Sequence, residues 1–135
     1  MFSSYSGKPA FTIHRKIYRQ KSSDDGFGSF SLNRNLFSNL VVLVDEASMI
    51  SNNLAEDSVF GTGRLLEDLI SFVRDGNGCK LILIGDTAQL PPVGTELSPA
   101  LDRTLLNGMI RVSGEFVLTD IVRQSGNSGI LAHAT

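Results

Sequence analysis

The sequence predicts an α/β fold in which helices pack against a parallel β-sheet. Two observations predict it: two short, continuous apolar runs and a helical pattern between them. The runs are Leu40–Val44 and Leu81–Ile84, and both contain only aliphatic residues. Such runs are typical of strands buried on both faces of a parallel sheet, because strands with one solvated face alternate apolar and polar residues. Strand, helix and strand in this order predict a βαβ unit with a right-handed crossover.

The helix between the runs is predicted from its apolar spacing. Spacings of one, three, one and three residues place one stripe on a single helix face, formed by Leu65, Leu66, Leu69, Ile70 and Val73. We expect Glu67, Asp68 and Asp75 to face away from this stripe or to end the helix. The Asp-Gly-Asn-Gly stretch at residues 75–78 is a stop signal, so the helix should end there.

Further elements are expected outside this unit. A second helix should begin at Ser98-Pro99, with Ser98 as its cap and Pro99 in its first turn. A third strand is expected at Phe116–Leu118, and a last helix should open near Ser128. Residues 22–38 are rich in Ser, Asp, Gly and Asn, so they should form a loop or a small hairpin.

The composition excludes several classes of protein. The chain has 135 residues, of which 41% are hydrophobic and 19% are charged, as in one globular domain. Its apolar runs are shorter than the roughly 18 residues needed to span a bilayer, and its first residues do not form a secretory signal. The lone Cys79 excludes an internal disulfide and a metal site built from cysteines. We therefore expect a cytoplasmic protein without membrane contact.

The formal net charge of −2 conceals an asymmetry along the chain. Residues 1–38 carry six Lys or Arg against two Asp, whereas residues 39–135 carry six against twelve acids. A basic arm on an acidic body favours contact with a polyanion, such as nucleic acid, on one side of the molecule. Asymmetry of this size also arises by chance in a short segment.

Polar residues follow each expected strand, at the edge where open parallel sheets bind ligands. In chain order they are Asp45 and Glu46, then Asp86 and Gln89, then Arg123 and Gln124. Acids, a glutamine and an arginine at one edge suit phosphoryl transfer, because carboxylates and water hold Mg²⁺ and a cation stabilises phosphoryl charge. The plainer interpretation is a strand that ends in surface acids, with Arg123 as an ion-pair partner.

Four segments resemble motifs of superfamily 1 DNA helicases, most closely the RecD-like (exodeoxyribonuclease V alpha-like) branch. They are Thr12–His14 (a Thr-Ile-His element), Val44–Met49 (motif II, or Walker B), Gly85–Gly94 (motif III) and Leu118–Gln124 (motif IV). They occur in the family's order, and the motif III string is the most specific. The resemblance implies a partial RecA-like P-loop NTPase domain over residues 1–135, with a small inserted hairpin, or pin, over residues 18–39.

The resemblance also implies roles for individual residues in binding and hydrolysing ATP. Asp45 would hold Mg²⁺ through water, and Glu46 would be the general base that activates the attacking water. Gln89 would sense the γ-phosphate, and Arg123 would contact it as an arginine finger. Asp86 would share this nucleotide-binding edge.

A second set of residues would contact DNA. Thr12 and His14 would lie on the track of single-stranded DNA, with Pro91 and Pro92 of the loop after the second strand. The pin would split the duplex at a fork.

Each of these residues also has a plainer interpretation. His14 could be a packed surface histidine, Gln89 could satisfy loop backbone groups, and the two prolines could simply stiffen a turn. The aromatic residues Phe27, Phe30 and Phe37 are interpreted as hairpin core rather than as platforms on which bases stack. Cys79 is interpreted as inert packing.

The sequence contains no phosphate-binding loop of the form G-x-x-x-x-G-K-[ST], which such a motor needs. The nearest candidate is Gly7-Lys8, but Pro9 replaces the Ser or Thr and Phe2 stands where the first Gly belongs. We therefore expect an internal piece of the first motor domain, separate from its P-loop segment and from the second motor domain. By itself such a chain should hydrolyse ATP negligibly.

The leading hypothesis is thus that the chain is part of a DNA helicase that uses ATP and Mg²⁺. Such a helicase would translocate 5′ to 3′ on single-stranded DNA and unwind a duplex, as in DNA repair or recombination. Two alternatives stay open. One is a non-catalytic module that binds single-stranded DNA. The other is a different P-loop ATPase, such as a chaperone-like or phage-packaging enzyme, although the paired prolines after Gln89 argue against it. RNA is not excluded as the nucleic acid.

Overall fold

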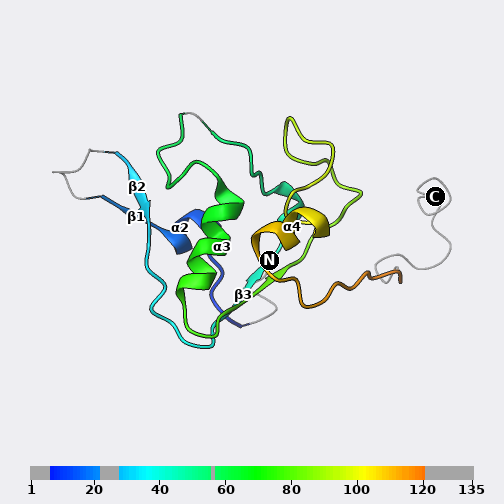
Figure 1. Cartoon of the computed structure of the whole chain (residues 1–135), viewed down its shortest axis with the longest axis horizontal. Coiled ribbons are helices and arrows are strands. Elements are labelled where there is room, and N and C mark those ends of the chain that lie inside the picture. The colour runs from blue at the N-terminus through cyan, green and yellow to red at the C-terminus, as the bar shows by residue number, and fades with distance from the viewer. Residues whose placement is uncertain (1–6, 22–27, 56, 121–135) are drawn as a thin grey trace.

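The computed structural model describes residues 7–21, 28–55 and 57–120 (Figure 1). Its elements are α2 (Ile13–Ile17), β1 (Tyr18–Gln20), β2 (Phe30–Leu32), β3 (Val41–Val44), the 3-10 helix η2 (Ala47–Met49), α3 (Leu65–Asp75), β4 (Lys80–Leu83) and α4 (Arg103–Met109). β1 and β2 pair antiparallel, and β3 and β4 pair parallel. The predicted α/β class with a parallel sheet and helices is confirmed.

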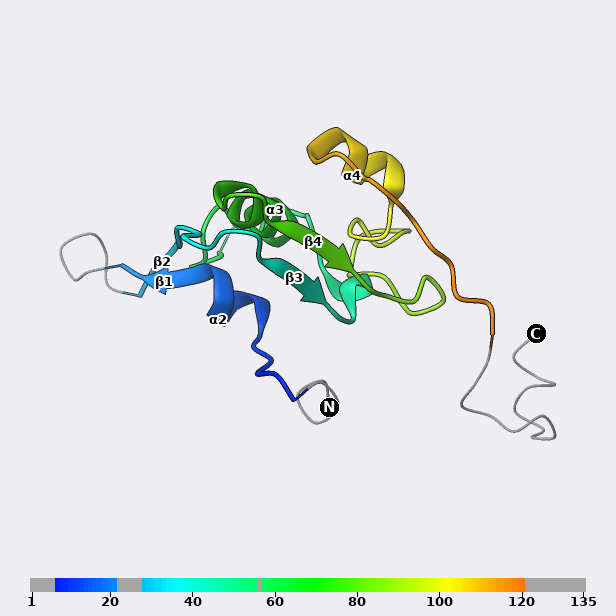
Figure 2. The same cartoon turned by 90° about the horizontal axis from the view of Figure 1, so that it is seen from below.

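β3, α3 and β4 form the predicted βαβ unit. The parallel register pairs Val41 with Lys80 and Val44 with Leu83, so both strands end at the same edge of the sheet. β3 begins one residue later than its predicted run, and β4 begins and ends one residue earlier than its own. Figure 2 shows α3 lying over one face of the pair. This arrangement places the residues that follow each strand next to one another.

α3 supplies most of the core. The buried residues on its inner face are Leu66, Leu69, Ile70, Phe72 and Val73. The helix ends at Asp75, inside the predicted stop signal, and Gly78 has a φ of +64° that glycine adopts without strain. The expectation that Asp68 faces away was wrong, since only 2% of it is exposed. Its carboxylate is buried because it accepts hydrogen bonds from Tyr18 and Thr62.

The predicted burial of both sheet faces does not hold for the described residues. Val42 and Leu83 pack against the core beside α3. The side chains that alternate with them are 41–52% exposed, namely Ile84, Leu43, Ile82 and Val41. Because α3 packs on one face of the sheet, only the side chains of that face are shielded from solvent. The aliphatic runs therefore indicated strands correctly but did not indicate how many faces are covered.

The hairpin of β1 and β2 lies within residues 18–39. Tyr18 pairs with Leu32 and Gln20 with Phe30. Phe30, interpreted as hairpin core, stacks on Phe60 with ring centroids 4.6 Å apart. Phe27 lies outside the described residues. Phe37 is not hairpin core: it follows the hairpin, its ring is 53% exposed, and its carbonyl accepts a hydrogen bond from the Asn77 N–H beside β4.

α4 begins later than predicted. The side chain of Asp102 accepts hydrogen bonds from the N–H groups of Thr104 and Leu105, at 2.8 and 3.1 Å, and so caps the helix. Ser98, the predicted cap, is buried, and its hydroxyl lies 3.5 Å from the carbonyl of Ala47. The Ser98 side chain, which the local pattern assigned to the cap of α4, instead makes a contact with a residue distant in the sequence.

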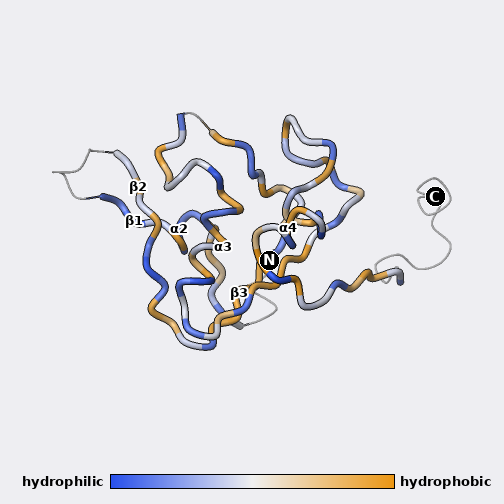
Figure 3. The backbone as a smooth tube through the Cα atoms, in the orientation of Figure 1, coloured by the Kyte–Doolittle hydropathy of each residue, from blue (hydrophilic) through white to orange (hydrophobic). Residues whose placement is uncertain are grey.

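The predicted strand at Phe116–Leu118 is wrong. The segment is extended, but it pairs with no strand of the described chain, and its three side chains are 78–94% exposed. Figure 3 shows this apolar stretch leading away from α4. A strand needs a hydrogen-bonding neighbour, which a sequence pattern does not supply. The helix expected near Ser128 lies outside the described residues, and none of the described helices is long and apolar enough to cross a bilayer.

Candidate functional site

The parallel pairing brings the segments after β3 and β4 together. Beyond the last strand pair, the N–H of Ile84 donates to the carbonyl of Val44 at 2.8 Å. The N–H of Ala47 then donates to the carbonyl of Ile84, also at 2.8 Å. Asp45 and Glu46 are held between these two bonds, alongside the segment that leads to Asp86. The convergence that the sequence predicts for these residues follows from the register.

Glu46 has an unusual backbone conformation. Its φ of 54° and ψ of 39° lie in the left-handed region, where a residue with a Cβ is strained. The side chain of Asp45 accepts the Glu46 N–H at 3.0 Å, and Glu46 leads directly into η2. Strain of this kind persists where the surrounding structure enforces it, often at functional sites. The backbone of the exposed Glu46 is therefore fixed at the carboxyl edge of the sheet.

A side-chain hydrogen bond connects the two edge segments. The Ser48 hydroxyl donates to Oε1 of Gln89 at 2.9 Å, although the residues are 41 positions apart. Ser48 is 1% exposed, whereas Gln89 is exposed. With Oε1 bound to Ser48, the amide Nε2 of Gln89 is the end that can donate to a ligand. Sequence reasoning gave Ser48 no role, because nothing in the local pattern indicates a partner so far along the chain.

Asp86 has a local structural role. Its Oδ1 accepts the N–H of Ala88 at 2.9 Å, and its carbonyl accepts the N–H of Gln89 at 3.2 Å. These bonds form a tight turn that directs Gln89 back toward Ser48. A cavity of about 60 Å³ lies between this turn and the start of α4, with Pro91 and Asp102 among its lining residues. It is much smaller than the roughly 300 Å³ of a typical ligand pocket.

The acids of this edge fit a metal only in part. Among the described residues, no three His, Cys, Asp or Glu side chains gather closely enough to hold a metal ion by themselves. Oδ1 of Asp45 accepts the Glu46 N–H, and the residue is exposed, so Oδ2 is available to a ligand. Mg²⁺ in nucleotide sites is bound by one or two carboxylates, with phosphates and water supplying the other ligands. The donor set therefore fits Mg²⁺ that arrives with a phosphate group.

The two residues of the Thr-Ile-His element that are expected to contact DNA take part in local structure. The hydroxyl of Thr12 accepts the N–H of Arg15 at 3.3 Å and caps α2. The His14 ring lies edge-on to Phe60, with centroids 4.8 Å apart, and 5.6 Å from Tyr18. His14 is nevertheless exposed, so the packed contacts orient the imidazole without removing it from solvent.

Pro91 and Pro92 begin a turn in the loop after β4. The carbonyl of Pro92 accepts the N–H of Thr95 at 3.1 Å and its hydroxyl at 2.7 Å. Figure 2 shows α2 beside β3 and this loop beyond the far end of the strands. The structure therefore does not bring Thr12 and His14 together with the two prolines. Arg123 and Gln124 lie outside the described residues.

One family matches nearly the whole chain. The AAA domain family covers residues 2–134. Comparison with curated proteins and with solved structures found no match. Members of this family are P-loop ATPases, which bind nucleotide and usually use Mg²⁺. The extent of the match, the parallel βαβ unit and the acidic carboxyl edge agree, and the chain belongs to the AAA domain family of P-loop ATPases.

Proposed function

We propose that the chain is part of the ATP-driven motor of a DNA helicase of the RecD-like branch of superfamily 1. The observation that carries this proposal is the hydrogen bond between Ser48 and Gln89, which joins the motif II and motif III segments at one sheet edge. A motor must transmit the state of its nucleotide to its nucleic acid. A contact between the segment with the acids and the segment with Gln89 suits that task.

Each edge residue has a role in this proposal. Asp45 would hold Mg²⁺ through water with the oxygen that its contact to Glu46 leaves available. Glu46 would orient and deprotonate the attacking water, and its constrained backbone supports that assignment. The amide of Gln89 would donate to the γ-phosphate, and Arg123 would add a positive charge there. Magnesium bound with the nucleotide would offset the charge of the phosphates.

The nucleic-acid side is proposed from other residues. Thr12 and His14 on α2 would contact single-stranded DNA, and the hairpin within residues 18–39 would meet the duplex at a fork. The loop with Pro91 and Pro92 would touch the same strand. Its neighbours Leu90 and Val93 support this, because they are 90% and 98% exposed in a turn that the prolines stiffen. Movement 5′ to 3′ belongs to the same proposal.

The test is hydrolysis in a protein in which a P-loop strand and helix precede this segment. We expect release of phosphate from ATP that requires Mg²⁺ and rises with single-stranded DNA. Glu46→Gln should abolish turnover and leave ATP affinity within about twofold, because the amide keeps the shape of the side chain but cannot accept the proton. Unchanged turnover in that variant would overturn the role of Glu46.

Two controls accompany this test. Lys8→Ala should leave ATP affinity unchanged, because Lys8 precedes a proline that removes a backbone donor. The isolated 135-residue chain should hydrolyse ATP negligibly. If its affinity for an oligonucleotide ignores MgATP even when the P-loop is supplied, the non-catalytic binding module is the better description.

A further inference from the structure

Two exposed phenylalanines lie against the same lysine. The ammonium of Lys16 is 4.8 Å from the ring centroid of Phe37 and 6.0 Å from that of Phe11. The guanidinium of Arg15 is 5.4 Å from the Phe11 centroid. The two rings remain 52% and 53% exposed with these cations in place. Phe11, Arg15, Lys16 and Phe37 thus form an aromatic–basic patch from two segments of the chain.

Phe37 is held in place by its backbone. Its N–H donates to Oδ1 of the buried Asn35 at 3.1 Å. Its carbonyl accepts the N–H of Asn77 at 3.2 Å and lies 3.4 Å from Sγ of Cys79. Asp75 fixes the same segment by accepting the Asn35 N–H at 2.8 Å. An ordered backbone therefore keeps this aromatic ring at the surface, where it can contact a ligand.

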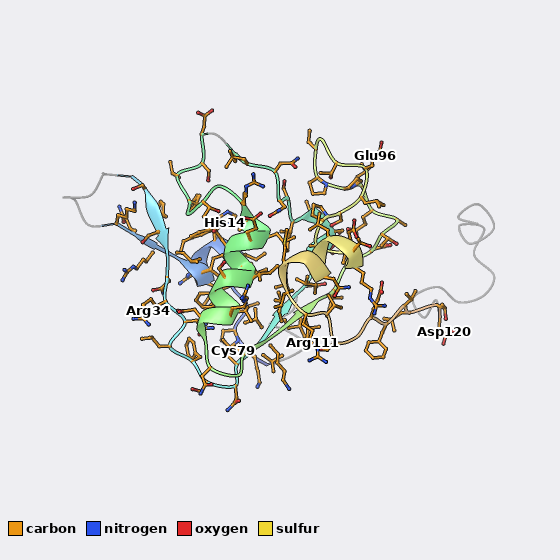
Figure 4. All side chains as sticks on the ribbon, in the orientation of Figure 1. His14, Arg34, Cys79, Glu96, Arg111 and Asp120 are labelled. Carbon is orange, nitrogen blue, oxygen red and sulfur yellow. The ribbon has the colours of Figure 1, made fainter. Side chains whose placement is uncertain are left out.

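The two segments that carry the patch are rich in basic residues. Residues 7–21 and 28–44 contain six Lys or Arg and no acid. In the described part of the chain, the ion pairs join Arg64 to Glu67 and Arg103 to Glu115, so Arg15 and Lys16 take no part in one. In Figure 4, Arg34 and His14 lie on the side of α2 and the hairpin, and Glu96 and Asp120 lie on the opposite side. The basic arm of the sequence therefore carries the aromatic–basic patch.

We propose that the aromatic–basic patch binds single-stranded nucleic acid, with bases stacked on Phe11 and Phe37 and phosphates beside Arg15 and Lys16. Exposed rings beside unpaired cations supply both contacts that a flexible single strand offers, a base face and a phosphate. A duplex presents only its phosphates to such a surface. Phe37 is bonded to Asn77 at the amino ends of the parallel strands, whereas Asp45 and Glu46 follow their carboxyl ends, so nucleic acid and nucleotide can be bound at once. This inference rests on the nucleic-acid half of the proposed function and assigns residues to it.

The test uses the 135-residue chain and a fluorescein-labelled oligothymidylate of about 20 nucleotides, longer than the roughly 4–16 that small single-strand sites cover. Fluorescence anisotropy gives the affinity. We expect Phe37→Ala and Phe11→Ala each to weaken binding about tenfold, and Phe37→Trp to preserve it, because one stacked base contributes on that scale. Phe37→Leu should weaken binding like Phe37→Ala, since it keeps apolar volume and removes the ring. Leu36→Ala is the matched control, because Leu36 is the neighbouring residue and is 84% exposed.

Salt dependence tests the charges separately. Lys16→Gln should lower the slope of log affinity against log salt by about 0.7, the value for one phosphate of a single strand. Arg111→Gln, which removes an exposed cation beyond α4, should leave the slope unchanged. Circular dichroism and thermal unfolding would establish that each variant folds.

The outcomes separate this inference from the proposed function. If the chain binds the oligonucleotide but the Phe variants match wild type, the patch is not the site, and the helicase proposal stands with DNA bound elsewhere. If Lys16→Gln weakens binding while Phe37→Leu does not, the face binds polyanions in general, including anionic vesicles, and base stacking is refuted. If the chain binds no oligonucleotide, the patch proposal fails, whereas the ATPase prediction is judged by Glu46→Gln alone.

Discussion

The hydroxyl of Ser48 donates a hydrogen bond to Oε1 of Gln89 at 2.9 Å, between two segments that follow neighbouring parallel strands. Ser48 is the buried middle residue of η2, and Gln89 closes the turn that Asp86 organises. The bond fixes which end of the Gln89 amide faces outward. A side chain with no obvious chemistry of its own thereby orients one that the proposed mechanism requires.

We predict a measurable coupling between these two residues. Ser48→Ala and Gln89→Ala should each lower the free energy of unfolding by about 1 kcal/mol, the usual net value of a hydrogen bond. The double variant should lose about 1 kcal/mol less than the two single losses combined, because the same bond cannot be lost twice. Urea unfolding of the four proteins measures this. Additive losses would mean that the bond contributes nothing to stability.

The strained backbone of Glu46 predicts an unusual stability ranking. At a φ of 54°, Glu46→Gly should be about 1 kcal/mol more stable than Glu46→Ala, because glycine has no Cβ to clash in the left-handed region. The two variants lack the same carboxylate, so Ala is the matched control for lost charge. Thermal unfolding of both decides the point. Equal stabilities would show that residue 46 is not held in this conformation in solution.

Tyr18 and Asp68 predict how stability depends on alkaline pH. Tyr18 is 8% exposed, and its hydroxyl donates to Oδ2 of Asp68 at 2.6 Å. Burial raises the pKa of the Tyr18 phenol well above its usual value of about 10, and the hydrogen bond and negative charge of Asp68 raise it further. The folded state therefore holds this proton more tightly than the unfolded state. Its stabilising effect is complete below about pH 10 and is lost as the pH rises above that value.

Urea unfolding between about pH 8 and pH 11 tests this dependence. Wild type should lose up to about 1.4 kcal/mol per pH unit above pH 10 through this group. Tyr18→Phe should be less stable by about 1.5–3 kcal/mol near pH 8, since it removes a hydrogen bond to a buried carboxylate. The difference between the two proteins should then shrink above pH 10. A constant difference across the range would contradict the assignment.

Two glycine substitutions should change stability in opposite directions. A Cβ at Gly61 would overlap the Asp68 carboxylate and lie 2.6 Å from Cε1 of Tyr18, and the φ of +49° disfavours any side chain. We expect Gly61→Ala to cost at least about 2 kcal/mol, because both neighbours are buried and hydrogen-bonded. Gly108 in α4 has no atom within 4 Å of the added Cβ, so Gly108→Ala should stabilise by about 0.5–1 kcal/mol. Chemical unfolding of both measures the contrast.

Local patterns determined the central βαβ unit. The aliphatic runs, the apolar stripe of α3 and the stop after Asp75 are properties of neighbouring residues, and the structure follows them within about one residue. The order of these elements also determined that Asp45 and Asp86 follow strands that end at one edge. The sequence by itself thus specified the parallel pair and the segments that its carboxyl edge would present.

The tertiary structure alone decided which side chains are buried and which are paired. Asp68 is buried because Tyr18, 50 residues away, donates to it, and Ser98 does not cap a helix because it faces Ala47. Phe37 is exposed because its backbone is bonded to Asn77 rather than to the hairpin. Hydrophobic periodicity depends only on residues that are one or two turns away in the sequence. Burial and hydrogen bonding depend on partners that are distant in sequence, and only folding brings these together.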